Sequence, residues 1–244
     1  MTEILIINPN TSAEVTVSLD RLAREELGQA VLVRTVTASF GARYIATRAS
    51  VAIAGHAALD AYASALEKGA HPDAVILACF GDPGLEALRE VAAAPVFAFA
   101  ESSLAKAAAE PGRFAIATVG STWGDMLAEL VERRGLEDRV SAIIALDEDS
   151  RMADVAVRKI AAGAAASGAS RVIVGGTGLI PIMHEIVRGL PIPVLDPHRT
   201  TLRTAAEGGL LRRLPAPQIS EFVGIAPSLQ RLLLGERDPL ASSG

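Results

Sequence analysis

The one cysteine of this 244-residue chain, Cys79, is the side chain best suited to covalent or acid–base chemistry. It follows the apolar run 74–78 and precedes the turn 81–84, which contains Gly, Asp and Pro. In open α/β folds, ligands bind where a strand ends in such a turn before a helix. We expect the N–H groups of the next helix to lower the pKa of the thiol, with Asp82 opposing them unless it caps a helix. The alternative is a buried cysteine that serves only as a small apolar side chain.

Three further turns place polar groups or glycines at predicted strand ends. In the first, Asn8, Asn10 and Thr11 offer amides and a hydroxyl beside the free N–H groups of a helix start. Such a turn suits an anion or a carbonyl group, although an ordinary helix cap has the same composition. The other two turns contain Thr118 and Thr177. The turn with Thr177 lacks the third glycine and the downstream acid of a dinucleotide site.

Two more segments carry side chains that could reach a ligand. The loop 40–48 contains Arg43 and Tyr44, which suit a carboxylate or an imide, unless this is a solvated loop whose tyrosine packs locally. His198 follows a predicted strand end and could act as a general base, or it could be an ordinary residue of a helix start.

The elements that must position these residues alternate regularly along the chain. Short runs of branched apolar residues alternate with alanine-rich amphipathic stretches, which predicts an α/β fold with parallel sheets. The predicted strands are 3–7, 31–35, 74–78, 96–99, 114–118, 140–144, 172–174 and 193–195. The clearest predicted helices are 12–28, 50–69, 122–134, 150–167 and 199–212.

A weak internal repeat predicts two similar lobes that face each other across a cleft. Cys79 precedes Pro95 by 16 positions and Gly176 precedes Pro193 by 17, with a glycine-rich turn and a helix between them each time. Gly176 therefore takes the place in the second half that Cys79 holds in the first. We predict one lobe from residues 1–98 and 208–244 and the other from residues 99–207.

Composition limits the partners and the compartment. A net charge of −5 without any basic run predicts no nucleic-acid partner, and no apolar run is long enough to span a bilayer. The N-terminus has no positive segment, and one cysteine cannot form an internal disulfide, so we expect a cytoplasmic protein. A single cysteine and four scattered histidines predict no metal site.

With these residues identified, the chain resembles the aspartate/glutamate/hydantoin racemase superfamily, and within it the hydantoin and allantoin racemase branch. The resemblance implies two flavodoxin-like lobes, an active site between them, no metal or organic cofactor, a small-molecule substrate and frequent homo-oligomers. It also implies that substrate contacts come from the turns and the loop described above. The matching segments are 8–11, 40–45, 79–84, 101–102, 118–120, 175–178 and 193–196. The implied substrate-binding residues are Asn8, Asn10, Thr11, Arg43, Tyr44, Phe80, Gly81, Thr118, Gly176 and Gly178.

The chain departs from this family at the second catalytic position. Such racemases resemble two-base enzymes in which one thiolate removes the proton α to a carbonyl and a thiol on the opposite face returns one. Cys79 matches the first thiol, whereas Gly176 stands at the second. Loss of one general acid or base costs about 10² to 10⁴ in rate, so an efficient two-thiol racemase is excluded.

Three interpretations remain. In the first, Cys79 exchanges the α-proton of a hydantoin-like ring, and Thr177, His198 or water serves the other face. In the second, one thiol performs one-sided chemistry, as in relatives that decarboxylate malonates or isomerise maleate. In the third, the protein binds a small cyclic amide or acid without turnover. The hydantoin-branch segments place the first interpretation ahead.

Overall fold

The computed structural model describes residues 1–208 and 221–235 and confirms the predicted alternation of strands and helices. Each apolar run forms a short strand. Strands that are covered by helices on both faces of their sheet are buried, as expected for parallel sheets. The strands are β1 (Thr2–Asn8), β2 (Val31–Thr37), β3 (Ala74–Leu77), β4 (Val96–Ala98), β5 (Phe114–Val119), β6 (Val140–Leu146), β7 (Arg171–Val174) and β8 (Val194–Leu195).

Side-chain caps mark the starts of some of the helices. Ser12 accepts the N–H of Val15 at the start of α1, and Thr47 forms a capping box with Ser50 at the start of α2. The helices are α1 (Ala13–Leu27), α2 (Arg48–Glu67), α3 (Leu85–Val91), α4 (Phe99–Ala109), α5 (Ser121–Arg133), α6 (Ala153–Ser167), α7 (Met183–Gly189), α8 (Pro197–Glu207) and α9 (Pro227–Leu233). The predicted end of the helix 199–212 lies outside the described residues.

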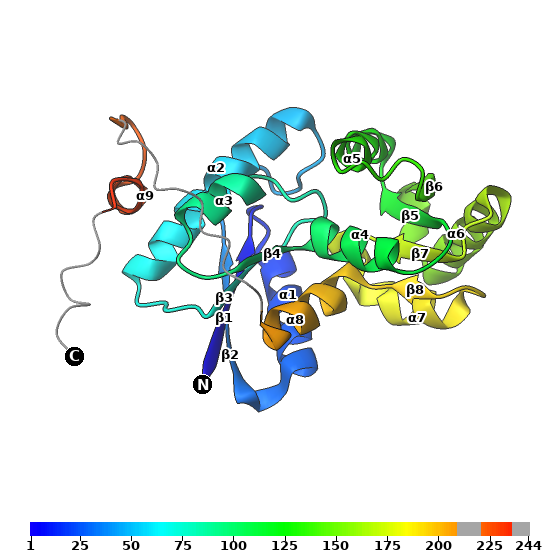
Figure 1. The fold of residues 1–244 in the computed structure, drawn as a ribbon, viewed down its shortest axis with the longest axis horizontal. Coiled ribbons are helices and arrows are strands. Elements are labelled where there is room, and N and C mark those ends of the chain that lie inside the picture. The colour runs from blue at the N-terminus through cyan, green and yellow to red at the C-terminus, as the bar shows by residue number, and fades with distance from the viewer. Residues whose placement is uncertain (209–220, 236–244) are drawn as a thin grey trace.

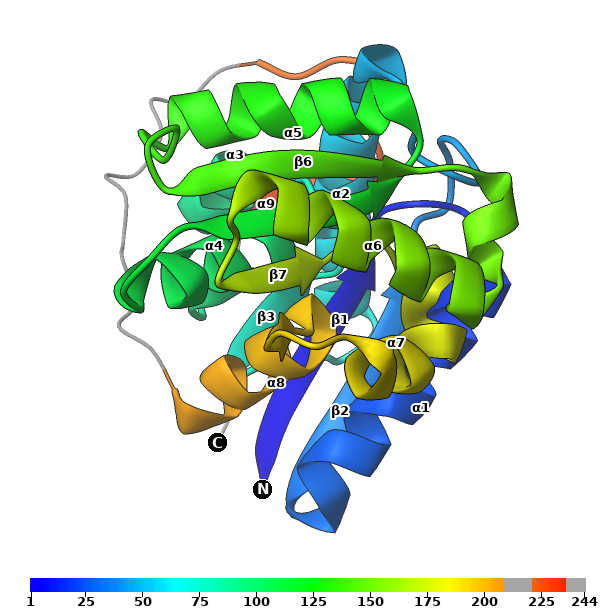
Figure 2. The same ribbon diagram turned by 90° about the vertical axis from the view of Figure 1, so that its right-hand side faces the viewer.

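The two sheets have the same strand order, which confirms two similar lobes. One sheet runs β2-β1-β3-β4 and the other β6-β5-β7-β8, and every pairing is parallel. Figure 1 shows the sheets side by side with α4 and α8 between them, and Figure 2 shows α5 running along β6. In this correspondence β3 matches β7. Cys79 and Gly176 therefore stand at equivalent positions, each two residues beyond its strand.

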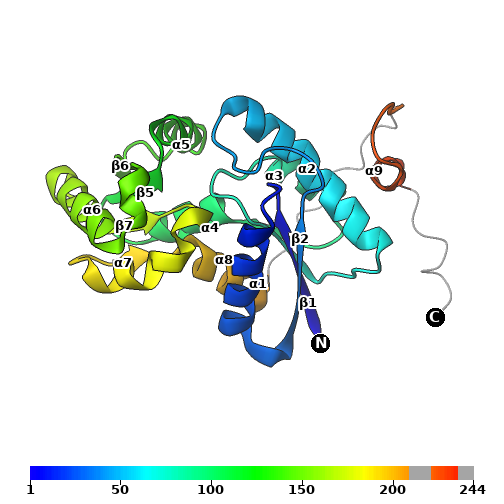
Figure 3. The same ribbon diagram turned by 180° about the vertical axis from the view of Figure 1, so that it is seen from behind.

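One apolar cluster crosses from lobe to lobe. It contains Ile6 of the first sheet, Ile116 and Ile173 of the second, and Leu104 and Leu202 from α4 and α8. Helix α8 packs against α1, β3 and α4, an arrangement that Figure 3 shows from behind. Smaller clusters fill the outer face of each sheet.

The proposed lobe boundaries stay a prediction. Helix α9 packs against α2, whereas α8, which the sequence assigns to the second lobe, contacts both α1 and α4. The remainder of the segment 208–244 lies partly outside the described residues.

Candidate active site

The strand ends of the first sheet bring Cys79 next to the turn after β1. The N–H of Ala78 donates to the carbonyl of Ile7 at 2.8 Å, so the chain beyond β3 runs beside Asn8. The Asn8 side chain is completely buried and donates to Asn10 Oδ1 at 3.0 Å and to the carbonyl of Ser12 at 3.1 Å. Asn8 thus stabilises the turn internally.

Two close contacts bring the Cys79 turn against the second lobe. The Phe80 ring packs directly on Gly175, where an added Cβ would lie 2.2 Å from Cδ1 of the ring. The indole of Trp123, on α5, packs in the same way against Gly81, where a Cβ would lie 2.8 Å from Cζ2. Both glycines are required because a side chain would meet an aromatic ring. The turns after β3 and β7 and the start of α5 therefore meet between the lobes.

The electrostatic surroundings of Cys79 differ from the prediction. Its side chain is 9% exposed. Burial raises the pKa of the thiol, and the Asp82 carboxylate raises it further. The predicted lowering of this pKa by helix amides is wrong, because α3 begins only at Leu85 and the intervening turn carries an acid. In this conformation the resting group is a neutral thiol.

Asp82 connects the Cys79 turn to helix α4. Its two carboxylate oxygens accept the N–H groups of Ala100 at 2.9 Å and Glu101 at 2.7 Å, so it caps the start of α4 from another element. The residue is 8% exposed and has a φ of 52°, a conformation that non-glycine residues adopt rarely. Burial raises the pKa of Asp82 to about 7, against the opposing effect of the two N–H donors.

This pKa predicts a pH dependence of stability. The folded protein keeps the proton of Asp82 up to about pH 7, whereas the unfolded chain releases it near the ordinary aspartate pKa of 3.8. The unfolded state binds fewer protons in this window, so the contribution of Asp82 to the free energy of unfolding falls as pH rises. In urea titrations between about pH 4 and pH 7, Asp82→Asn is expected to flatten this slope.

The control for this titration is Asp154→Asn. Asp154 is exposed and its pKa is lowered by the guanidinium of Arg158, so it does not titrate in the same window. An unchanged slope in the Asp82 variant would contradict the assignment, whatever its absolute stability.

On the opposite lobe, Gly176 leaves open space. Among the described residues no atom lies within 4 Å of a Cβ built there, and its φ of 125° is one that L-residues rarely adopt. Thr177 begins a 3₁₀ turn directly after it, Gly178 is exposed, and Thr118 is buried at the end of β5. The second thiol position thus holds space instead of a reactive group.

The loop that contains Arg43 and Tyr44 lies near the first turn but points to solvent. The N–H of Thr11 donates to the carbonyl of Ala42 at 3.0 Å, which joins the loop to the turn after β1. The Arg43 guanidinium pairs with Glu14 at 3.2 Å, and the Tyr44 side chain is 56% exposed. Contact of either residue with a ligand stays a prediction.

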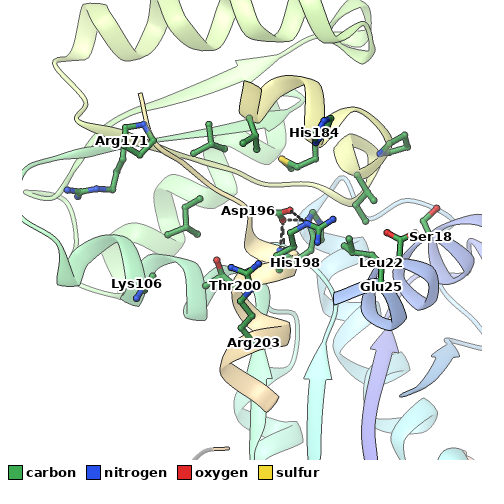
Figure 4. A pocket seen from close by; sticks show the side chains of 18 of the residues that line it. Ser18, Leu22, Glu25, Lys106, Arg171, His184, Asp196, His198, Thr200 and Arg203 are labelled. Atoms are coloured by element: carbon green, nitrogen blue, oxygen red, sulfur yellow. Dashed lines mark hydrogen bonds and ion pairs between the residues drawn. The ribbon is translucent and has the colours of Figure 1, made fainter. Parts of the chain in front are cut away.

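His198 lines a separate cavity of about 750 Å³ between α1, α7 and α8. Figure 4 shows His198 and Asp196 joined in its wall, with Leu22 on the α1 side. His198 Nδ1 lies 2.9 Å from Asp196 Oδ1, and its ring packs edge-on to Phe99, whose centroid lies 4.9 Å away. Nε2 is buried without a hydrogen-bond partner among the described residues. None of the other predicted site residues lines this cavity, so the catalytic role of His198 stays a prediction.

Within residues 1–208 and 221–235, no group of three or more His, Cys, Asp and Glu side chains is arranged to hold a metal ion. No helix in the same part of the chain is long and apolar enough to cross a membrane.

The model of the Asp/Glu/hydantoin racemase family matches residues 4–205, which includes all four strand-end turns and both lobes. The chain belongs to this family. Two hydantoin racemases are similar to it in sequence. That of Paenarthrobacter aurescens is 29% identical over 83% of this chain and 89% of its own length. The hydantoin racemase of Pseudomonas sp. strain NS671 is 25% identical over 94% of this chain and 97% of its own length.

A solved structure extends the likeness to three dimensions. The allantoin racemase from Klebsiella pneumoniae superposes with a TM-score of 0.80 at 25% identity, covering 94% of this chain and 99% of its own. As a member of the racemase family, with these relatives, the chain is an isomerase.

Sequence reasoning missed three features of this racemase-family site. The sequence left open whether Asp82 caps a helix, but no local pattern showed that it caps α4 instead of α3, the helix that follows it. Trp123 packs both against the apolar cluster that joins the lobes and over Gly81, and no local pattern indicated the second contact. The ion pair between Arg48 and Glu129, which are 81 residues apart, had no sequence signal.

Proposed function

We propose that this protein is a cofactor-independent enzyme that exchanges the proton on the carbon α to a carbonyl of a small hydantoin-like ring. Cys79 is its single thiol acid or base. The observation that carries the proposal is the equivalence of Cys79 and Gly176 beyond the ends of β3 and β7. The two turns that contain these residues are in contact with each other. The names of the relatives support a cyclic amide as the substrate class.

The chemistry follows from this arrangement. Because the resting group is a neutral thiol, Cys79 must first lose its proton to water. The resulting Sγ anion takes the α-proton and becomes a thiol again, while the electron pair of the broken C–H bond moves into the carbonyl to give an enolate. N–H groups of the turns after β3, β5 and β7 stabilise the enolate oxygen. The proton then returns either from Cys79, with retention, or from a water on the Gly176 face, with inversion. Asn10 and Thr11 hold the ring amide.

The raised pKa of the thiol favours a second candidate. A neutral Cys79 is a proton donor, so the same site suits a one-sided reaction in which a carbanion formed by loss of CO₂ receives the thiol proton. The covalent isomerase of the maleate type needs a thiolate nucleophile, which this burial disfavours. Assembly into a homo-oligomer and a cytoplasmic location are further parts of the proposal.

Deuterium exchange tests these alternatives directly. In D₂O we expect hydantoins or allantoin to take up deuterium at the α-carbon, measured by NMR, faster than they lose optical rotation. Release of CO₂ from a malonate would select the second candidate. Binding without exchange, for hydantoins, allantoin and dicarboxylates alike, would contradict catalysis. Heat-denatured protein gives the spontaneous rate.

A further inference from the structure

Two different kinds of contact hold the lobes together. On one side, α1, α4 and α8 share the continuous apolar cluster that joins both sheets. On the other side, the start of α2 lies beside α5, as Figures 1 and 3 show from opposite directions. An ion pair joins these two helices: Arg48 Nε lies 3.1 Å from Glu129 Oε1. The two side chains are 59% and 42% exposed, so water screens the pair.

Trp123 makes the second contact on this side. The six-membered edge of its indole lies against Gly81, with an added Cβ at 2.8 Å from Cζ2 and 3.1 Å from Cη2. Gly81 follows Cys79 by two residues, and its N–H donates to the carbonyl of Cys79 at 3.0 Å. The indole, from α5 of the second lobe, therefore packs on the short turn that carries the thiol.

These contacts matter because Cys79 is only 9% exposed. With so little of the residue exposed, we expect a planar five-membered ring to reach the sulfur only when the surroundings open. The apolar side of the junction is the more costly one to open. The ion pair is the weaker connection, since exposed pairs contribute little to stability.

We propose that Trp123 and the Arg48–Glu129 pair form a gate that controls access to Cys79. Trp123 is a positioning residue that closes the turn over the thiol, and the ion pair holds α5 in the closed arrangement. The inference rests on the proposed function only in taking Cys79 as the reactive group. Its test needs no turnover, so failure of the gate and failure of the catalytic assignment are distinguishable.

The test is the second-order rate at which iodoacetamide alkylates Cys79, followed by mass spectrometry. Because the chain has one cysteine, the mass change reports this position alone. Arg48→Glu is expected to raise the rate about two- to fivefold, the effect of losing an exposed ion pair. The double variant Arg48→Glu, Glu129→Arg should return it to the original value. Trp123→Ala is expected to raise it about tenfold.

In Arg48→Glu, the effect of the changed charge on the alkylation rate is opposite to the expected effect of opening the gate. Replacing Arg48 by an acid adds negative charge, which can only disfavour the thiolate and slow alkylation, so a faster reaction reports access. The pH at which the alkylation rate reaches half its maximum should also not decrease in this variant. Arg158→Ala is the matched control, because it breaks an exposed ion pair with Asp154 inside α6.

Rates in Arg48→Glu and Trp123→Ala equal to that of the unchanged protein would overturn the proposal. Thermal unfolding of each variant separates gating from general loosening. If Trp123→Ala does not fold, Trp123→Leu keeps an apolar side chain without the indole edge, and it is expected to accelerate alkylation as well. A rise in Arg158→Ala as large as that in Arg48→Glu would equally contradict the gate.

Discussion

Cys79→Ser is expected to lower the rate of α-proton exchange by about 10³-fold, within the range for loss of a general acid or base. A serine hydroxyl is a far weaker acid than a thiol, so it can neither lose nor donate a proton efficiently near neutral pH. The change removes no carbon atom and breaks no side-chain hydrogen bond within the described part of the chain, so the packing of Phe80 on Gly175 should persist. The measurement is deuterium uptake by a hydantoin in D₂O.

Circular dichroism and thermal unfolding provide the control for this variant. Ser150→Ala is a matched alteration of a buried hydroxyl near Asp147, remote in sequence from the Cys79 turn, and should retain exchange. Full exchange in Cys79→Ser would place the chemistry at another residue.

Gly176→Cys is expected to increase racemisation by about 10² to 10⁴, because it restores a thiol at the position equivalent to Cys79. Among the described residues, no atom obstructs a Cβ at this position. The φ of 125° opposes the change, and we expect a cost in unfolding free energy of about 1 to 3 kcal/mol. Optical rotation should then decay nearly as fast as deuterium enters.

Gly176→Ser is the matched control for the rebuilt thiol pair. Serine imposes the same backbone strain and nearly the same volume but supplies no useful acid or base. Equal racemisation rates in the Cys and Ser variants would show that space and strain at this position matter and that the second thiol does not.

Local patterns were sufficient to predict the architecture. Buried strands such as β3 and β7 consist of branched apolar residues, and Pro95 and Pro193 precede the next strands, so the repeat was visible without coordinates. The equivalence of Cys79 and Gly176 followed from spacing alone. The predicted helix starts at residues 12 and 50 lie within two residues of the observed starts of α1 at Ala13 and α2 at Arg48.

The electrostatics of the site could not be predicted in the same way. The pKa of Cys79 depends on how many atoms exclude water and on Asp82, whose carboxylate is held by helix α4 and not by the helix that follows it in sequence. Likewise, Trp123 reaches Gly81 from the other lobe. Such effects arise from tertiary contacts between segments more than 15 residues apart, which no local pattern encodes.

The apolar cluster that joins both sheets couples the stability of the two lobes. The lobes share the buried apolar side chains of α4 and α8, such as Leu104 and Leu202, each 3% exposed. Separating the lobes would expose this apolar surface to water, so we expect both lobes to unfold together in one cooperative transition. A substitution that destabilises one lobe is therefore expected to reduce activity at the site that the other lobe helps to form.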